Sequence, residues 1–592
     1  VDRNTIELVR QASGGNPLFI EELCHAVARD ARTLEVRESW PSAVIPNSLS
    51  SLIVSRIAQL DVPQREALER LAVMGNVVPA WLLESAANAA GIREAVPELT
   101  ALDLVFPGES EGSLRFKHGI TRAVILHSLG RDERRALHLQ VARSVETRFR
   151  ESEREGVFEM LAYHYGETGE YSKAADYAEA AGNKALAASA MDRARAQYQA
   201  ALRALGRFEP FDDATYQRWM AIARQLALAC LFDAEPEQLV IYQHAAELAR
   251  THNDRANETY AEYWSAYINY AMGEAAKAMA HIDRAHELVK SLDDEPLRTQ
   301  ILATWGQVRA NACDYAAALP AIDDALARQA PFKRRPRIAY PYAYSLAAKA
   351  MVFGDQGRFD DAYACLDEAD ELTLGPIHAI QGSITSMRAA VYLWQGRWQE
   401  ALDTARMNEA LGDRMGSRYI SAMGTALAGY ARWHLDPDAS IDSMARALSW
   451  VEGNHQMIWT SLHFSWLCEL LVKLGRYQEA RRSAVWVLRR ARKLERLGES
   501  VAYCALAELP AERGAAVSAE RCFGRARASA DVRRSERELT LIDLKEAAHF
   551  EQRNRRTEGL AALSGCRERF SNMGMYWYAA AAQRLELKLA QL

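Results

Sequence analysis

The feature that most constrains the fold is a short motif that recurs from about residue 157 to the end of the chain. A glycine is followed by one variable residue and an aromatic residue, and an alanine-rich segment with helical spacing then begins. The clear copies are Gly169-Glu-Tyr171, Gly357-Arg-Phe359, Gly396-Arg-Trp398 and Gly475-Arg-Tyr477. Gly357 and Gly396 are 39 residues apart, and Gly396 and Gly475 are 79 apart, close to twice that spacing. Self-similarity at such a period predicts a stack of helical hairpins.

Less regular copies of the motif fill the gaps, at Gly273, Cys313-Asp-Tyr315, Leu435-Asp-Pro437 and Gly514. A single helical pair cannot bury its apolar face, so neighbouring pairs stack on one another. Alanine and glycine at the crossing points let the helices approach closely. The pattern resembles the tetratricopeptide repeat, stretched to about 40 residues. We therefore expect a mainly α fold, with a tetratricopeptide-like α-solenoid over residues 151–592.

Length and composition set the outer limits. A chain of 592 residues is too long for one core, and 49% hydrophobic with 25% charged residues is typical of soluble globular protein. The net charge of −6 gives no general attraction to nucleic acid or anionic lipid, and no apolar stretch is long enough to cross a bilayer. Eight cysteines are scattered without a Cys-x-x-Cys pair, which predicts reduced core thiols and a cytoplasmic location.

The first 46 residues contain a second informative motif, the turn Gly14-Gly15-Asn16-Pro17. Two glycines allow a tight turn, and the proline fixes φ and removes one N–H where an adenine could lie against the chain. Apolar residues at helical spacing follow, so an ordinary helix-start turn is an equally weighted interpretation. The chain begins with Val1, already inside a helical pattern, and we expect it to be a piece of a longer polypeptide.

Residues 47–150 show a different pattern. Helices are predicted after Asn47, after Pro63 and after Pro79. Apolar residues on both sides of the turn Pro107–Gly112 then predict a β-hairpin, and helices followed by one hairpin indicate a winged helix. The third predicted helix, from Trp81, carries no Arg or Lys to reach phosphates or bases, so we favour a structural role over DNA binding.

No catalytic constellation is evident in the sequence. The Gly-x4-Gly-Lys-Ser/Thr phosphate loop, His-Glu-x-x-His and Gly-x-Ser-x-Gly are absent, and no histidine pairs with cysteine at zinc-finger spacing. The adjacent carboxylates Glu21-Glu22 diverge on a helix and are interpreted as a solvated face. We therefore predict no catalytic residue, no metal site and no enzyme activity for this chain alone.

His118 stands apart from the other histidines because it leaves the predicted hairpin at the mouth of a helix. A helix N-terminus has unpaired N–H groups and a positive dipole end, so it suits an anionic ligand to which an imidazole could also donate. The favoured alternative from spacing alone is a capping histidine packed beneath the wing.

Gly14-Gly-Asn-Pro17, a winged helix, Phe116-Lys-His118 before a helix, and an Ala-rich repeat together resemble the signal-transduction ATPases with numerous domains (STAND). The resemblance implies that residues 1–46 are the helical end and linker of an ATPase module, 47–150 the winged helix and 151–592 the sensor. It also implies that Pro17, with Gly15 and Asn16, contacts adenine, and that His118 contacts the terminal phosphate of ADP. Gly119 stands where the family often has Asp. ADP or ATP with Mg²⁺ is expected only with an upstream domain that holds the phosphate loop.

A narrower resemblance rests on Ser13–Leu23, Ile45–Leu49 with Ser55–Ile57, Phe116–His118 and Leu161–Tyr165, in that order. These segments are similar to bacterial proteins that join a class III adenylate/guanylate cyclase, an ATPase module and tetratricopeptide repeats. The alternatives are a LuxR-like transcription regulator and a free-standing tetratricopeptide scaffold. The predicted partners are a protein or small effector on the solenoid and, as one possibility on activation, further copies of the chain in a homo-oligomer. The charge and hydropathy described above predict no nucleic acid or membrane binding.

The solenoid region contains two basic clusters, at Lys333–Arg337 and at Arg489–Arg496. Each could hold an acidic partner, but a solvated repeat face is the favoured interpretation.

Overall fold

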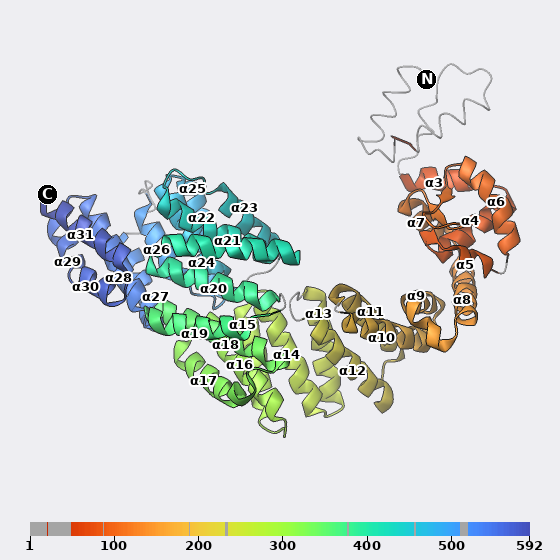
Figure 1. The fold of residues 1–592 in the computed structure, drawn as a ribbon, viewed down its shortest axis with the longest axis horizontal. Coiled ribbons are helices and arrows are strands. Elements are labelled where there is room, and N and C mark those ends of the chain that lie inside the picture. Colours follow the sequence, from red (N-terminus) through yellow and green to blue (C-terminus); the bar gives the residue numbers. More distant parts are fainter. Residues whose placement is uncertain are drawn as a thin grey trace, which may run out of the picture. The chain divides into compact units, whose positions relative to one another are not determined.

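The computed structural model describes residues 20–21, 49–86, 88–188, 190–230, 235–375, 378–454, 458–509 and 519–591. The chain forms two compact units, Val1–Cys230 and Leu231–Leu592. In Figure 1 the first unit runs from α3 to α12 and the second from α13 to α31. The boundaries predicted near residues 46 and 150 both lie inside the first unit.

From residue 49 to residue 128, the described part of the first unit contains five helices. Asp61 caps the second of them by accepting a hydrogen bond from the Gln64 amide at 2.8 Å, and Gln64 reaches back to the Asp61 amide. Leu68, Leu71 and Leu99 are buried completely and form the centre of this domain. The helices are α3 (Leu49–Ile57), α4 (Val62–Met74), α5 (Ala80–Glu84), α6 (Ala89–Ala101) and α7 (Gly119–Ser128).

A small antiparallel sheet accompanies these helices. Its strands β1 (Val77–Val78), β2 (Val105–Pro107) and β3 (Leu114–Phe116) lie in the order β1-β3-β2. The β2–β3 pair is the hairpin that the sequence predicts, with Phe106 opposite Arg115. Strand β1 was not predicted, because two residues are too few to show a period.

The third predicted helix of this domain needs a correction. A single helix was expected from Trp81 onward, but α5 ends at Glu84 and a new helix, α6, begins at Ala89. Asn88 accounts for the break because its side-chain oxygen accepts a hydrogen bond from the Gly91 amide at 3.3 Å, which caps α6.

Helix α8 (Arg131–Arg148) leads into the helical hairpins of the first unit, which are α9 (Phe158–Thr168), α10 (Tyr171–Ala187), α11 (Met191–Leu205) and α12 (Asp213–Ala229). Short 3-10 turns η1 (Glu151–Gly156) and η2 (Gly206–Phe208) join them. The close crossing of α10 and α11 depends on Gly182, where a Cβ atom would lie 2.7 Å from the Tyr198 ring.

The second unit is entirely helical over its described residues. Its helices pair in sequence, so that each odd-numbered helix from α15 to α27 packs against the even-numbered helix before it. Their bounds are α13 (Pro236–Thr251), α14 (Arg255–Ala271), α15 (Ala275–Val289), α16 (Glu295–Asn311), α17 (Tyr315–Gln329), η3 (Ala330–Phe332), α18 (Pro336–Gln356), α19 (Phe359–Leu372), α20 (Ala379–Gln395), α21 (Trp398–Met415), α22 (Arg418–Leu435), α23 (Asp442–Gly453), α24 (Thr460–Lys473), α25 (Tyr477–Ala491), α26 (Glu499–Glu508), α27 (Ala519–Arg533), α28 (Glu536–Glu551), α29 (Arg556–Ala562), α30 (Cys566–Asn572) and α31 (Tyr576–Gln591).

The four clear copies of the Gly-x-aromatic motif each mark the turn inside a helical pair, as predicted. The glycines of all four clear copies have left-handed backbone, with φ between 72° and 86°. The aromatic residue two positions later is the first residue of α10, α19, α21 or α25. Cys313 takes the same conformation, at φ 64°, and Tyr315 begins α17. Gly514 lies outside the described residues. The mainly α solenoid expected from the sequence is therefore confirmed.

The core of the second unit is built from these repeats. One apolar cluster runs from Ala310 to Leu589 and is rich in alanine. The cysteines described by the structure, 230, 313, 365, 468, 504, 522 and 566, are all free thiols, and most are buried. Within the described ranges, no helix combines the length and the apolar character needed to cross a bilayer.

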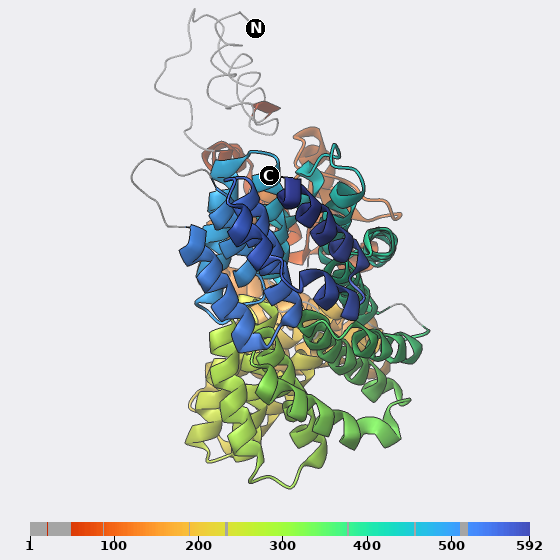
Figure 2. The same cartoon turned by 90° about the vertical axis from the view of Figure 1, so that its left-hand side faces the viewer.

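The C-terminal helices of the second unit return to helices much earlier in the sequence. In Figure 2 the blue C-terminal helices stand beside the green helices of the same unit, and α28 contacts α18.

Candidate functional site

The start of α7 carries the histidine singled out in the sequence. Strand β3 ends at Phe116, Lys117 follows, and His118 is the residue before the helix. The Phe116 amide donates to the Asn76 carbonyl at 2.9 Å, which fixes the strand end. Arg122, one turn into α7, donates its Nε to the Ala72 carbonyl at 2.7 Å and so anchors the helix to α4. The two basic residues before α7 are thus held on a rigid support.

Both basic side chains meet the same carboxylate. Lys117 forms an ion pair with Glu21, and the Nε2 atom of His118 lies 3.3 Å from the other Glu21 carboxylate oxygen. Lys117 also lies 3.6 Å from Asp103. The side chains are about one-third exposed: Lys117 27%, His118 32% and Glu21 35%. This cluster is therefore accessible from solvent.

The charges of the cluster support one another. The hydrogen bond from Lys117, assisted by the charges of Lys117 and His118, lowers the pKa of the Glu21 carboxyl, although partial burial opposes the shift. The same hydrogen bond to Glu21 raises the pKa of Lys117. Lys117 is therefore a cation, and Glu21 an anion, throughout the physiological pH range.

Spacing left two interpretations of His118 open, and the structure shows where its side chain lies. His118 occupies the N-cap position of α7 by its backbone, but its side chain makes no capping hydrogen bond. The imidazole points to Glu21 instead and keeps 32% of its surface exposed. It is neither a side-chain cap nor a histidine packed beneath the wing. Gly15, Asn16 and Pro17 lie outside the described residues.

Glu21 is the residue that sequence reasoning missed. Its neighbour Glu22 made it look like half of a solvated acidic pair. The available signal was its position four residues after Pro17, on the helix that follows the Gly-Gly-Asn-Pro turn. The ion pairs of Glu21 connect this residue to the entrance of α7.

The arrangement suits an anionic group. Two basic side chains and the N-terminal end of a helix meet at one solvent-accessible point, where a carboxylate already contacts both side chains. A terminal phosphate, like this carboxylate, is an anion that accepts hydrogen bonds from cationic side chains. The start of α7 can therefore hold an anionic group between Lys117 and His118.

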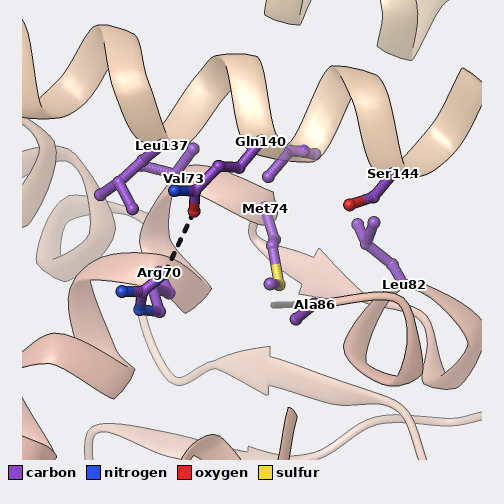
Figure 3. Close-up of a pocket in the computed structure, with 9 residues that line it drawn as sticks. Arg70, Val73, Met74, Leu82, Ala86, Leu137, Gln140 and Ser144 are labelled. Atoms are coloured by element: carbon purple, nitrogen blue, oxygen red, sulfur yellow. Dashed lines mark hydrogen bonds between the residues drawn. The ribbon is translucent and has the colours of Figure 1, made fainter. Parts of the chain in front are cut away.

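A cavity beside this domain does not compete for that role. It lies between α4, α5 and α8 and is lined by Arg70, Val73, Met74, Leu82, Ala86, Leu137, Gln140, Val141 and Ser144 (Figure 3). Its volume of about 20 Å³ is enough for one water molecule and far below that of a ligand pocket. Arg70 donates to Gln140 across it at 3.2 Å, as Figure 3 shows.

A buried histidine pair lies where α8 meets α9. His138 and His164 approach at 2.9 Å between their Nδ1 atoms, and each is 1% exposed. Burial lowers the pKa of His138 to about 4 and that of His164 to about 3. Both rings are neutral at physiological pH, so one can donate to the other. The pair holds two helices together.

Three cations of the basic clusters are paired within the chain. Lys333 forms an ion pair with Glu368 at 2.6 Å. Arg490 pairs with the buried Glu495 at 2.6 Å, and Lys493 with Glu274 at 3.1 Å. These contacts favour structural roles for those three cations.

Comparison with protein families and curated proteins gives few matches. No protein-family model matches the chain. An uncharacterized protein of Rhizobium meliloti is 27% identical over 331 residues, which cover 52% of this chain and 30% of that relative. The chain therefore spans less than a third of the length of the curated relative it matches.

The similar solved structures are helical repeat proteins. A STAND protein with a tetratricopeptide repeat sensor from Pyrococcus horikoshii is 13% identical, with 75% of this chain and 69% of that chain covered and a TM-score of 0.33. A Rap protein complexed with competence and sporulation factor is 14% identical, covering 70% and 98%, with a TM-score of 0.33. Yeast Tom70 is 14% identical, covering 76% and 93%, with a TM-score of 0.28. Likenesses at these scores carry no argument about ligands or activity.

Proposed function

We propose that this chain is the regulatory region of a multidomain signalling ATPase. In this proposal the winged helix senses the nucleotide through Lys117 and His118, and the helical repeats bind a protein partner or small effector. The observation that carries the proposal is the joint pairing of Lys117 and His118 with Glu21. It connects the helix after the Gly-Gly-Asn-Pro turn to the domain that follows, which is the connection a nucleotide-dependent switch needs.

The residues of this chain would act by binding and positioning. Lys117 and His118 would hold the phosphate end of ADP, and Pro17, Gly15 and Asn16 would lie against its adenine. ADP would supply a terminal phosphate that competes with the Glu21 carboxylate for the same two side chains. Nucleotide exchange would then alter the contact between Glu21 and the winged helix. This change would bias the equilibrium between a closed, ADP-bound state and an open state.

The effector we propose is a class III adenylate/guanylate cyclase. The support is the ordered set of motifs from Ser13 to Tyr165 that resembles cyclase-linked STAND proteins. A LuxR-like regulator is the alternative output, and its test is DNA binding by the longer protein. The Rhizobium meliloti relative is likewise far longer than the region it shares with this chain.

The decisive experiment measures ADP retention in the protein that includes the upstream residues. His118→Gln removes the imidazole, and we expect ADP affinity to fall about tenfold or more, because a hydrogen bond to a charged group contributes about 1.5–3 kcal/mol. Basal output should rise in the same variant.

His127→Gln is the matched control. His127 lies on the same helix, is exposed, and bonds only to the Ala123 carbonyl of its own helix at 2.8 Å. Equal ADP affinity in both variants and the wild type would refute the nucleotide role of His118. If the longer protein binds no nucleotide at all, the scaffold alternative stands instead.

A further inference from the structure

Four charged side chains form a buried cluster that joins distant helices of the second unit. Asp355, near the end of α18, pairs with Arg533 at 2.6 Å and with Arg537 at 2.7 Å. Glu538 completes the cluster by pairing with both arginines. The four side chains are between 0% and 2% exposed. We call them the ionic clasp, and it connects residues almost 180 positions apart.

The clasp is extensively hydrogen-bonded. Tyr315 donates its hydroxyl to Asp355 at 2.8 Å, and Ser535 donates to the Asp355 backbone carbonyl at 2.5 Å. Burial would raise the pKa of Asp355, but Arg533 and Arg537 outweigh it and lower the pKa. The carboxylate is therefore ionised and depends on both guanidinium groups.

Further contacts join other early turns of the unit to later residues. Lys493 pairs with Glu274 at 3.1 Å, and Arg490 donates to the Gly273 carbonyl at 2.5 Å. The Trp577 ring packs edge-on against Trp398, with centroids 5.2 Å apart. The turn residues 273–274, 355–358 and 396–398 therefore lie against residues 490–493, 533–538 and 573–578. We call this set of contacts the seam.

The seam differs in kind from the ordinary stacking of the repeats. Helices α26, α27 and α28 are held together by an apolar cluster that includes Cys504, Phe523 and Ile542. The centre of the seam consists of charges removed from water, which pay a large desolvation cost that apolar contacts avoid. Water can restore that solvation when the clasp separates. Opening of the seam would therefore return these charges to water, and this gain would offset part of the cost of separating the aromatic contact between Trp398 and Trp577.

We propose that the second unit has a closed state, held by the ionic clasp, and an open state in which the seam is hydrated while the repeats stay stacked. Opening frees the turns at 273–274, 355–358 and 396–398, which the closed state covers with the chain's own later residues. This device is independent of the nucleotide role proposed above.

Hydrogen exchange of the backbone amides of the full chain tests the proposal. The amides of Arg358, Ser535 and Met575 close turns at the seam, while that of Ser417 closes a turn between α21 and α22. Asp355→Asn leaves two buried arginines with one carboxylate, so exchange at the three seam amides should accelerate about 100-fold or more. Exchange at Ser417 should stay unchanged.

A milder pair of variants keeps the test informative if Asp355→Asn fails to fold. Lys493→Glu replaces the exposed seam pair by two like charges and should speed seam exchange roughly threefold to fivefold. Lys473→Glu is its matched control, because Lys473 pairs with Glu508 at the same 3.1 Å but between neighbouring helices α24 and α26. Equal exchange in these two variants, or a uniform acceleration that includes Ser417, would overturn the proposal.

Discussion

The ion pair between Glu469 of α24 and Lys545 of α28 allows a quantitative prediction for the second unit. The Lys545 ammonium lies 2.7 Å from one carboxylate oxygen, and Tyr430 donates its hydroxyl to the other at 3.0 Å. Burial raises the pKa of Glu469, but the charge and hydrogen bond of Lys545 outweigh it and lower the pKa to about 2. Folding therefore favours the ionised form of Glu469 over the protonated form.

The change to make is Glu469→Gln, which keeps the size of the side chain and removes its charge. A fall of the pKa from 4.5 to about 2 corresponds to about 3 kcal/mol. Lys545 and Glu469 keep 18% and 16% of their surfaces exposed, so water screens the pair slightly. We therefore expect the free energy of unfolding at pH 7 to fall by about 2–3 kcal/mol.

The pH dependence follows from the sign of the shift. Because the folded pKa is lowered, the contribution of Glu469 is fully present above pH 4.5 and is lost as the pH falls toward 2. The difference between wild type and Glu469→Gln should therefore shrink over that range. Urea unfolding followed by tryptophan fluorescence measures it, since most tryptophans lie in the second unit.

Glu508→Gln is the control. Its partner Lys473 is 45% exposed, so removal of that pair should cost less than about 1 kcal/mol. If the two variants lose the same stability within about 0.5 kcal/mol, burial of the Glu469 pair does not have the effect assigned to it.

Three further predictions test the repeats. Gly357→Ala should lower the free energy of unfolding by about 1–2 kcal/mol in urea titrations, because φ is 86° and the new Cβ atom would force the Met573 side chain to shift. Gly475→Ala, at φ 72° with open space around it, should cost only the smaller backbone term, and equal losses would contradict the steric part of this reasoning. Tyr315→Phe should cost about 1–3 kcal/mol in the same assay, since it removes the 2.8 Å hydrogen bond to the ionic clasp, and a neutral result would count against that bond. Burial raises the pKa of Cys313 and of Cys468 to about 12. Neither thiol should therefore react with a thiol reagent at pH 8 until urea unfolds the chain. Rapid labelling of the folded protein would refute their burial.

The sequence was most informative where structure repeats locally. The glycine of each Gly-x-aromatic motif needs left-handed backbone, and the aromatic residue starts the next helix, so three residues are enough to locate the turn. The hairpin was predictable for the same reason, because its turn residues are contiguous.

Contacts between distant residues were not predictable. Asp355 and Arg533 are separated by almost 180 residues, and their pairing depends on how much each repeat rotates relative to the last. Glu21 is a similar case, because its helical pattern does not predict a contact with Lys117, which lies 96 positions away. The break between α5 and α6 was missed for a local reason: Asn88 caps a new helix where the sequence pattern predicted one continuous helix.

The seam has a consequence for how this chain can change in length. Solenoids ordinarily gain or lose copies freely, since each repeat contacts only its neighbours. Here α18 must meet α27 and α28 after a fixed number of helices. In the described part of the chain, the guanidinium partners of Asp355 are Arg533 and Arg537, which lie on those later helices. Duplication or loss of one hairpin between them would misalign the arginines with their carboxylate, whereas copies added before α13 would leave that alignment intact.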